Sequence, residues 1–416
     1  MKVVHVNSND VGGAAQASKN LHYALLRMGI HSTFLSKYYH STQLKNHYAY
    51  LKHKSVHHYM DYLLENYLLR GLFPPNDGYS QDTVLFTSPH SLFRPEVADI
   101  IQAADIVHLH WTSHFLDYQN FFNYINKPVV WSLHDMNAFT GGCHYAHHCS
   151  GFITGCTTCP QIGSTNQPQA AETYFIIKKQ AIENFKKLLI AAPSRWMLNQ
   201  SAKSLIFKNL AHFYLPNVYD PNVFKIGDPV YCKNKWNIPS HKINLLFVVH
   251  SFKIQSKGFG LLKLAIKLLP QDNFHCTLVG KDLDDIFLND ITYTKVNYVQ
   301  KQVEMAELYN AAEILMHPSI CDNAPNTIAE SLLCGTPVIA FNVGGVPEMI
   351  EDGMDGFLTY RQSAQDFADA ILKFVQQRTI FNRETISTRA TLKFNDTENL
   401  KPYLKLYSEM MDETAH

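Results

Sequence analysis

Two carboxylates separated by seven residues lie in the segment 318–350, PSICDNAPNTIAESLLCGTPVIAFNVGGVPEMI. Glu330 falls in a predicted helix that begins near Pro325 and ends at Gly335. A carboxylate accepts two hydrogen bonds at once, which suits the vicinal hydroxyls of a ribose, and the free N–H groups of a helix start attract phosphate. Asp322, in the preceding loop, is suited to a sugar hydroxyl. The alternatives are a solvated surface Glu330 and an Asp322 that caps the helix.

A lysine and two glycines are further candidates for binding phosphate groups. Lys257, in SKGFG, follows a predicted strand over 245–249, and a cation there would stabilise the charge that accumulates on a leaving diphosphate. A solvated lysine at a helix start is the alternative. Gly12 and Gly13 follow the first predicted strand, where glycine permits close backbone approach and the helix start offers amides.

Histidines end two further predicted strands. His134 follows the run 129–133 in WSLHD, and His110 and Trp111 follow 106–109 in HLHW. We expect Asp135 to orient the His134 ring. A buried histidine with satisfied hydrogen bonds is the alternative.

The loop 141–160 contains four cysteines, and the last two form a Cys-x2-Cys pair. Four thiolates in so short a stretch suit a tetrahedral structural Zn²⁺ site. Reduced thiols, disulfides and an iron–sulfur cluster remain open alternatives, and we expect the loop to shape the acceptor side rather than perform chemistry. The predicted ligands are Cys143, Cys149, Cys156 and Cys159.

Alternating strands and helices must position these residues. A strand at 3–6, a helix through 17–28 and a strand at 30–35 form a βαβ unit, and the pattern restarts at 245. This predicts an α/β protein of two Rossmann-like, doubly wound domains with a ligand-binding interdomain cleft. The predicted divisions are a first domain at 1–215, a linker at 216–239, a second domain at 240–385, and a C-terminal helical segment at 386–416 that crosses back to the first domain.

Between the strands of the first domain, residues 38–72 are rich in His, Lys and Tyr, with apolar side chains at near-helical spacing. We predict one or two helices there, and we favour an ordinary insertion over a membrane-surface or acceptor-binding helix.

Length and charge narrow the class of protein. The chain has 416 residues, enough for two cores, and its 36 Lys and Arg balance 36 Asp and Glu, which argues against nucleic-acid binding through phosphate neutralisation. No window is apolar enough to span a bilayer, and the N-terminus has no signal-peptide pattern. We expect a cytoplasmic protein with reduced cysteines.

Asp322 and Glu330, followed by CGTPVIA and GGVPE, resemble the E-x7-E signature of family-4 GT-B glycosyltransferases. The resemblance implies that Glu330 holds the nucleotide ribose, and that Asp322, with the backbone at Asn323 and Ala324, holds the donor sugar. Asp322 stands where the family usually has Glu. Pro325, Asn326 and the backbone at Val299 complete the implied donor site.

The same resemblance assigns the remaining candidates. Lys257 would pair with the donor diphosphate, and Lys253 would stand in for an arginine that the family places a few residues earlier. Gly12 and Gly13 match the family's first loop, and His134 matches a histidine that touches the donor sugar. His110 and Trp111 are candidate acceptor contacts.

The implied activity is a retaining transfer from a UDP- or GDP-sugar to a glycan or lipid-linked acceptor in bacterial surface polysaccharide synthesis (exopolysaccharide or O-antigen), at the inner face of the membrane. No catalytic cofactor is implied, and only a structural zinc is expected. The rival hypotheses are an inactive sugar-nucleotide or partner-binding protein and a nucleotide-sugar epimerase.

Overall fold

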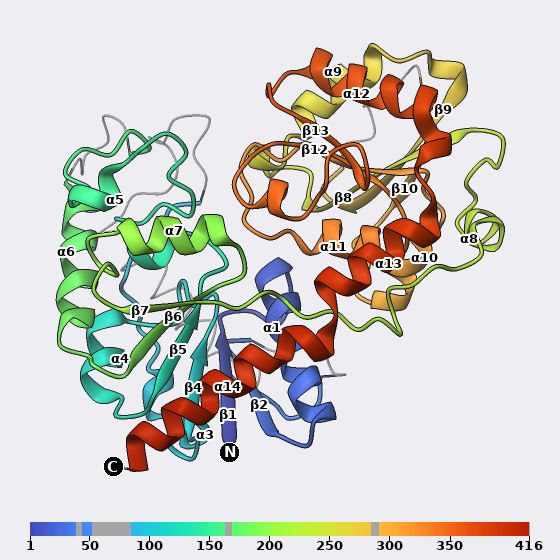
Figure 1. Cartoon of the computed structure of the whole chain (residues 1–416). Helices are drawn as coiled ribbons and strands as arrows, with labels where there is room; N and C mark the ends of the chain where they lie inside the picture. Colours follow the sequence, from blue (N-terminus) through green and yellow to red (C-terminus); the bar gives the residue numbers. More distant parts are fainter. Residues whose placement is uncertain (39–43, 52–84, 163–168, 284–290, 416) are drawn as a thin grey trace. The chain divides into compact units, whose positions relative to one another are not determined.

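The computed structural model of the chain describes residues 1–38, 44–51, 85–162, 169–283 and 291–415. These residues form two compact units. Unit 1 comprises Met1–Pro216 with Leu400–His416, and unit 2 comprises Asn217–Asn399. Each unit has its own sheet and its own hydrophobic core (Figure 1).

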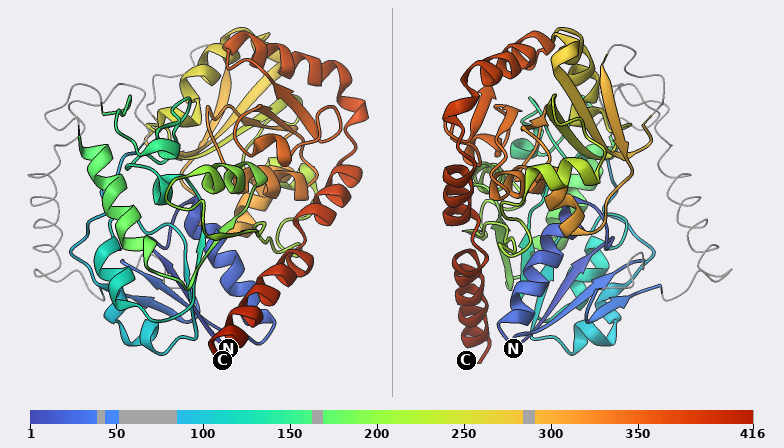
Figure 2. Two further views of the ribbon diagram at one scale, coloured as in Figure 1. Left: turned by 60° about the vertical axis from the view of Figure 1, so that its left-hand side comes forward. Right: turned by 90° about the vertical axis from the view of Figure 1, so that its right-hand side faces the viewer.

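The sheet of unit 1 is parallel throughout, with strand order β3-β2-β1-β4-β5-β6-β7. Its central strands are buried along their whole length, as expected where helices cover both faces of a parallel sheet (Figure 2). The strands are β1 (Lys2–Asn7), β2 (His31–Ser36), β3 (His47–Ala49), β4 (Ile106–Leu109), β5 (Val129–Ser132), β6 (Leu188–Ala192) and β7 (Ala211–Tyr214).

Helix α1 shows why these segments fold as they do. Leu21, Ala24 and Leu25 recur at helical spacing and are buried, and the chain leaves the helix through Gly29 at a φ of 75°. The other helices of unit 1 alternate with the strands. The helices are α1 (Gly13–Arg27), α3 (Asp99–Gln102), α4 (Tyr118–Tyr124), α5 (Gly151–Thr154), α6 (Ala170–Glu183) and α7 (Arg195–Lys203).

The final helix, α14 (Asp396–Ala415), returns to unit 1 (Figure 1). Its Tyr407 hydroxyl lies 2.5 Å from Nδ1 of His108 on β4, and its Tyr403 hydroxyl donates to the carbonyl of Leu215 at 3.1 Å. The last helix therefore contributes to the core of the first unit.

Unit 2 repeats the design with a six-stranded parallel sheet of order β10-β9-β8-β11-β12-β13. Its strands are β8 (Ile243–Ser251), β9 (Phe274–Lys281), β10 (Thr292–Val296), β11 (Ile314–His317), β12 (Val338–Phe341) and β13 (Gly356–Thr359). Its helices are α8 (Pro229–Lys235), α9 (Phe259–Lys267), α10 (Gln302–Asn310), α11 (Asn326–Leu333), α12 (Ala364–Gln377) and α13 (Arg383–Phe394).

Both sheets reverse their winding direction beside their first strand. In unit 1 the reversal falls between β1 and β4, and in unit 2 it falls between β8 and β11. Ligands of open α/β sheets bind at the carboxyl ends of the strands flanking such a reversal. The topology therefore directs attention to residues that follow these four strands.

The unit boundaries differ from the predicted domain divisions. The predicted linker 216–239 contains α8, and its Tyr219 and Phe224 side chains are only 1% exposed within the core of unit 2. The segment beginning at 386 starts inside α13, which belongs to unit 2. Buried aromatic side chains make 217–239 part of the second core, although its prolines and weak periodicity suggested a linker.

Most of the helical insertion predicted for 38–72 lies outside the described residues. Among the helices that the structure describes, none combines the length and apolarity needed to cross a membrane.

Candidate functional site

Glu330 lies on α11 and is buried, with 6% of its surface exposed. This excludes the solvated surface glutamate considered from the sequence. Burial raises the pKa of its carboxyl to about 7, although a hydrogen bond from the Tyr309 hydroxyl to Oε2, at 2.9 Å, acts in the opposite direction. A desolvated carboxylate with one protein donor retains capacity to accept hydrogen bonds from a ligand.

Asp322 forms an ion pair with Lys257, whose Nζ lies 2.6 Å from Oδ2. His317, the last residue of β11, places Nε2 at 3.3 Å from the same oxygen. Burial by itself would raise the pKa of Asp322, but the Lys257 ammonium and His317 outweigh burial and hold the pKa well below its usual range. Asp322 is therefore a buried anion. The residue that immediately precedes α11 is Pro325, so Asp322 is not the cap of that helix.

Two glycines bring the loops of this site together. Gly258, at a φ of 74°, approaches Pro318 so closely that a Cβ would stand 1.8 Å from the Pro318 carbonyl oxygen. Gly344, at a φ of 56°, approaches Asp322 in the same way, because a Cβ there would stand 1.9 Å from the Asp322 carbonyl oxygen. Only glycine combines this backbone conformation with this proximity. The Lys257 loop and the GGVPE loop thereby pack against the loop of Asp322.

The remaining donor-site candidates lie around this centre within unit 2. Asn323 is buried, Ala324 and Pro325 are half-buried, and Asn326 accepts a hydrogen bond from the Tyr219 hydroxyl at 3.0 Å. Lys253 is exposed in the loop after β8, and the half-buried Val299 follows β10. Lys257, rather than Lys253, is the lysine that pairs with Asp322.

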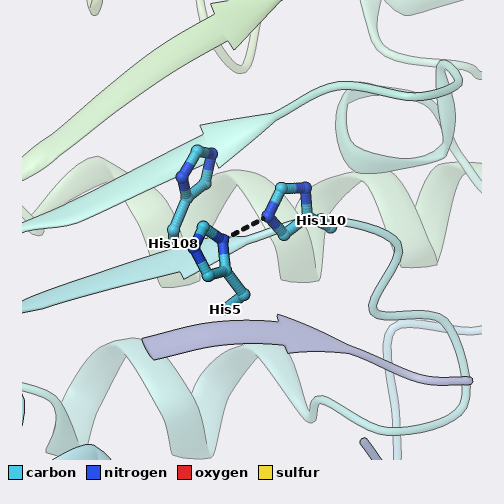
Figure 3. Close-up of side chains that lie close together, drawn as sticks. All are labelled: His5, His108 and His110. Carbon is cyan, nitrogen blue, oxygen red and sulfur yellow. Dashed lines mark hydrogen bonds between the residues drawn. The ribbon is translucent and has the colours of Figure 1, made fainter. Parts of the chain in front are cut away.

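Unit 1 contains a row of histidine rings that begins inside its sheet (Figure 3). Nδ1 of His5, on β1, lies 3.0 Å from Nε2 of His110, and Nδ1 of His110 lies 3.0 Å from Nε2 of His134. His108 stacks on His110 with 4.3 Å between ring centroids. Burial lowers the pKa of His134 to about 4 and also lowers the pKa values of His5 and His110, so all three rings are neutral at neutral pH.

The contacts in this row of histidines determine which ring nitrogen of each histidine carries the proton. Each neutral ring has one N–H and one lone pair. Nε2 of His5 is buried without a hydrogen-bond partner among the described residues, and a buried N–H is rarely left unpaired. Nε2 of His5 thus carries the lone pair, so Nδ1 of His5 donates to His110, and Nδ1 of His110 donates to Nε2 of His134.

The contacts of His110 and Asp135 bear on two expectations for this region. His110 is 4% exposed and both of its ring nitrogens are engaged by His5 and His134, so it supports His134 from behind and presents no ring nitrogen to an acceptor. Oδ2 of Asp135 lies 2.5 Å from Nδ1 of His144 and accepts from Nε1 of Trp111 at 2.9 Å. His110 contacts Nε2 of His134, and the negative charge of Asp135 also acts on the His134 ring, where it raises the pKa against the larger effect of burial.

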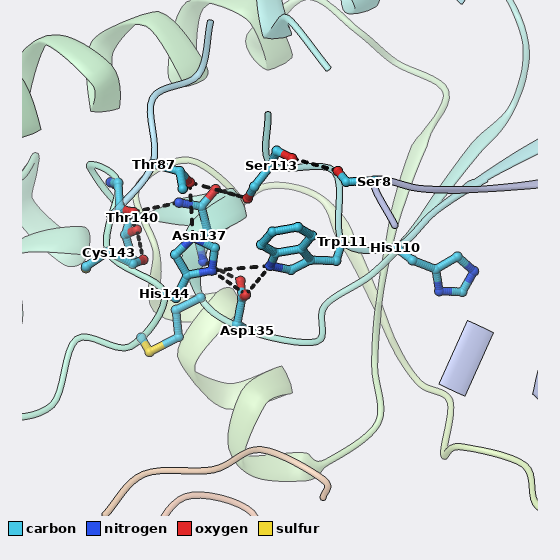
Figure 4. Close-up of polar contacts among 12 residues, drawn as sticks. Ser8, Thr87, His110, Trp111, Ser113, Asp135, Asn137, Thr140, Cys143 and His144 are labelled. Carbon is cyan, nitrogen blue, oxygen red and sulfur yellow. Dashed lines mark hydrogen bonds and ion pairs between the residues drawn. The ribbon is translucent and has the colours of Figure 1, made fainter. Parts of the chain in front are cut away.

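Asp135, in the loop after β5, connects two other segments through its Oδ2 atom: Trp111, just after β4, and His144, in the cysteine-containing loop (Figure 4). His144 continues the network through Nε2, which lies 3.0 Å from the hydroxyl of Thr87. Trp111 remains half-buried, so part of its indole is available to a ligand. The first loop of unit 1 is open as well: Gly12, at a φ of 99°, precedes α1, and added Cβ atoms at Gly12 or Gly13 would meet nothing within 4 Å.

The four cysteines of the loop 141–160 line one small, apolar cavity in unit 1. All four are free thiols. Within the described parts of the chain, the group of three or more candidate metal ligands whose atoms all lie within 4.8 Å is His5, His108 and His110. Nitrogen atoms of these histidines already bond one another, Ser132 and Tyr407, so we interpret the group as the hydrogen-bonded row described above.

Sequence reasoning proposed Glu330, Asp322, Lys257 and His134 as site residues, but it overlooked four residues that contact them or their neighbours. His317 could have been found, because it ends a strand beside the reversal of the sheet. Tyr309, His5 and His144 contact their partners through the fold, and their spacing gave no signal. The overlooked contacts are Tyr309 with Glu330, His317 with Asp322, His5 with His110, and His144 with Asp135.

The two parallel sheets define a protein of two α/β units, and unit 2 contains the buried carboxylates. Residues 243–377 match the family described as Glycosyl transferases group 1. The matched segment, about a third of the chain, contains Lys257, Asp322 and Glu330.

Curated relatives match parts of the chain. A 41.2 kDa protein of uncharacterised function from the cps region of Klebsiella pneumoniae is 26% identical over 182 residues, which cover 42% of this chain and 48% of that protein. A D-inositol 3-phosphate glycosyltransferase from Thermobifida fusca is 32% identical over 177 residues, covering 38% and 40%. The chain thus spans less than half of the length of these relatives.

Solved structures match along nearly the whole chain. HepE from Anabaena, in complex with UDP and glucose, has a TM-score of 0.67 at 16% identity and covers 98% of this chain and 99% of its own. WaaG, a glycosyltransferase involved in lipopolysaccharide biosynthesis, has a TM-score of 0.60 at 16% identity and covers 93% and 95%. At this identity the likeness shows the fold, and the GT-B prediction is confirmed.

Proposed function

We propose that this protein is a retaining glycosyltransferase that moves a sugar from a UDP- or GDP-sugar to a glycan or lipid-linked acceptor. The observation that carries the proposal is the ion pair of Lys257 with the buried Asp322 after β8 and β11, the strands that flank the reversal of the unit 2 sheet, with the buried Glu330 on the helix that follows β11. All three residues lie in the segment that matches group 1 glycosyl transferases. Two buried carboxylates can accept hydrogen bonds from the hydroxyl groups of a sugar nucleotide, and a cation can pair with its phosphates.

Each group has a role that fits its environment. Glu330 would accept the two ribose hydroxyls, because its buried carboxylate has oxygen lone pairs to spare. The Lys257 ammonium has three donors, so it can hold Asp322 and a diphosphate oxygen together. Its charge would stabilise the diphosphate as the glycosidic bond breaks. Asp322, with the backbone at Asn323 and Ala324, would hold the donor sugar.

Other candidates complete the proposed site. Pro325 and Asn326 border the start of α11, and the backbone at Val299 would meet the nucleobase. Lys253 would add positive charge beside the phosphates. In unit 1, Gly12 and Gly13 offer open backbone to the diphosphate or acceptor, His134 would contact the donor sugar, and the half-buried Trp111 would contact the acceptor.

We assign no protein nucleophile or general base. For retention, we infer that the leaving diphosphate and nearby backbone amides assist the attacking hydroxyl on the face from which the leaving group departs. No resident metal or organic cofactor is needed for this proposal. The relative from a cps region and the likeness to WaaG support a place in bacterial surface polysaccharide synthesis. A lipid-linked acceptor would bring the protein to the inner face of the cell membrane.

A thermal-shift experiment with UDP-, GDP- and ADP-sugars tests donor binding. We expect one nucleotide class to raise the Tm, since a ligand at 100 times its Kd stabilises the folded state by about 2.7 kcal/mol. Glu330→Ala and Lys257→Met should abolish or sharply reduce the shift. Lys267→Met, at an exposed position on α9, is the matched control and should behave as wild type.

Incubation of the binding donor in water, with and without acceptor fractions, then separates catalysis from binding. Donor hydrolysis or transfer supports an enzyme, and an α-linked product from an α-linked donor supports retention. Binding without turnover would favour an inactive sugar-nucleotide-binding protein, and epimerised nucleotide sugar would favour an epimerase. If no sugar nucleotide shifts the Tm of folded protein, the transferase proposal fails.

A further inference from the structure

The proposed reaction makes no use of the four cysteines that follow β5. They are spread over 143–159, yet all four line one apolar cavity of unit 1 together with Phe86, Ala146 and Phe152. The cavity gathers side chains from Cys-x5-Cys and Cys-x2-Cys spacings that are separated by six residues. Packing alone rarely brings four sulfur atoms to one cavity, whereas a tetrahedral soft-metal site requires it.

Backbone N–H groups already point at three of the sulfur atoms. The Gly151 N–H donates to Sγ of Cys149 at 3.3 Å. The Cys156 sulfur accepts from the N–H of Gly141, and the Cys159 sulfur accepts from Gln161 and Ile162. Such outer donors stabilise anionic ligands and fix their direction, as around bound metals.

Gly151 lies beside two of the cysteines. A point one Cβ bond from Gly151 lies 3.3 Å from Sγ of Cys149 and 3.7 Å from Sγ of Cys156. Glycine at this position leaves the space between the two sulfurs free of a side chain. The absence of a side chain at Gly151 therefore preserves the approach of Cys149 and Cys156.

A buried cation provides charge compensation. Lys178, on α6, is fully buried and donates to the carbonyls of Asn137 at 2.5 Å and Thr140 at 3.1 Å. It interacts electrostatically with Cys143 and Cys156. Four thiolates around Zn²⁺ carry a net charge of about −2, so a neighbouring ammonium would lower the cost of burying the complex.

We propose that Cys143, Cys149, Cys156 and Cys159 bind one structural Zn²⁺. No three of the four sulfur atoms lie within 4.8 Å of one another in the described structure, so Zn²⁺ binding would have to move the sulfur atoms closer together around the cavity. The site then clamps the loop that presents His144, next to Cys143, to Asp135 at 2.5 Å. This inference is independent of the sugar-transfer proposal.

Metal analysis of protein purified under reducing conditions tests the proposal. We expect about one zinc per chain, and tetrahedral tetrathiolate charge-transfer absorption after replacement by Co²⁺. Cys143→Ser and Cys159→Ser should each lower the bound zinc about tenfold or more, because loss of one ligand opens the coordination shell. The control Cys276→Ser, at a buried cysteine on β9, should retain one zinc.

The wild-type measurements stand even if a variant fails to fold. Folded wild-type protein that takes up less than about a tenth of an equivalent of zinc on reconstitution would overturn the proposal. So would a Co²⁺ spectrum without thiolate bands, or two disulfides in the reduced preparation. Chelation that lowers the Tm, with recovery on addition of zinc, would support it through a readout unrelated to sugar transfer.

Discussion

Burial of Glu330 changes its pKa, and its protonation state in turn affects the proposed contact with the ribose. Its pKa of about 7 lies above the ordinary 4.5, so the folded state binds the proton more strongly than the unfolded state. The carboxyl's contribution to the free energy of unfolding is therefore fully present below pH 4.5 and is lost as the pH rises through about 7. Hydroxyl groups of a bound ligand would favour the ionised carboxylate and would therefore lower its pKa, whereas burial raises it.

We predict that the affinity for a sugar nucleotide rises with pH, by about tenfold per unit below the midpoint, because the ionised carboxylate is the better acceptor. Tyr309→Phe removes the hydrogen bond that lowers the Glu330 pKa, so it should move the midpoint to higher pH. Glu330→Gln should flatten the profile. Calorimetric titration across neutral pH measures this, and an unchanged profile in Glu330→Gln would assign the titration to another group.

Spacing along the sequence was enough to suggest the residues of the proposed donor site, but not their protonation states. Asp322 and Glu330 were identified from their separation along the chain, and Lys257 from its place after a strand. Their electrostatic states followed from partners distant in sequence: Lys257 with Asp322, and Tyr309 with Glu330. A sequence specifies a carboxyl group, but burial and neighbours set its pKa.

At the scale of elements, the loops after β8, β11 and β12 meet through glycine. Gly258 and Gly344 each allow a backbone carbonyl to occupy space that a Cβ would fill. The Lys257–Asp322 ion pair depends on this proximity, because each partner lies within or beside one of these loops. Two otherwise ordinary loop glycines therefore become part of the proposed donor site.

We predict that Gly258→Ala lowers the free energy of unfolding by more than the roughly 1–2 kcal/mol expected from backbone conformation alone. It should also weaken sugar-nucleotide binding. Gly353→Ala is the matched control, because Gly353 has a φ of 78° but nothing within 4 Å of its Cβ position. Urea titration and calorimetry measure both effects. Equal losses in the two variants would show that the close approach to Pro318 is unimportant.

The histidine row is a second case in which element order matters. His5 and His110 come from β1 and the end of β4, which are neighbours in the sheet although 105 positions separate the two residues. Parallel pairing aligned by register brings His5 opposite His108. The resulting row sets the tautomer of His134, which no local pattern could have indicated.

At the scale of the whole molecule, the residues that follow unit 2 in the sequence fold as part of unit 1. Residues 400–416 belong to unit 1, and Tyr403 and Tyr407 of α14 are buried there. The stability of unit 1 thus depends on a segment that follows unit 2 in the sequence. The Tyr407 hydroxyl also satisfies Nδ1 of His108, beneath the histidine row.

We predict that Tyr407→Phe destabilises unit 1 by about 1–3 kcal/mol, because it leaves a buried nitrogen without its partner. Hydrogen exchange should become faster in β4 and β5 and stay unchanged in β8 and β11. Tyr360→Phe, at a tyrosine that is 76% exposed, should leave both sheets unaffected. Faster exchange confined to unit 2 would contradict this assignment of α14.

The sequence by itself determined the fold class and the donor-site candidates. Apolar runs and helical spacing are local signals that can be read from the sequence. The runs are clear here because strands of a parallel sheet that is buried on both faces are almost continuously apolar. The prolines and weak periodicity of 216–239 were local signals too, and they misled, because the burial of Tyr219 and Phe224 depends on a core built from distant strands. Only the tertiary structure decided which groups are paired, protonated or exposed. Those properties depend on through-space contacts: Lys257 with Asp322, His110 with His134, and four cysteines around one cavity.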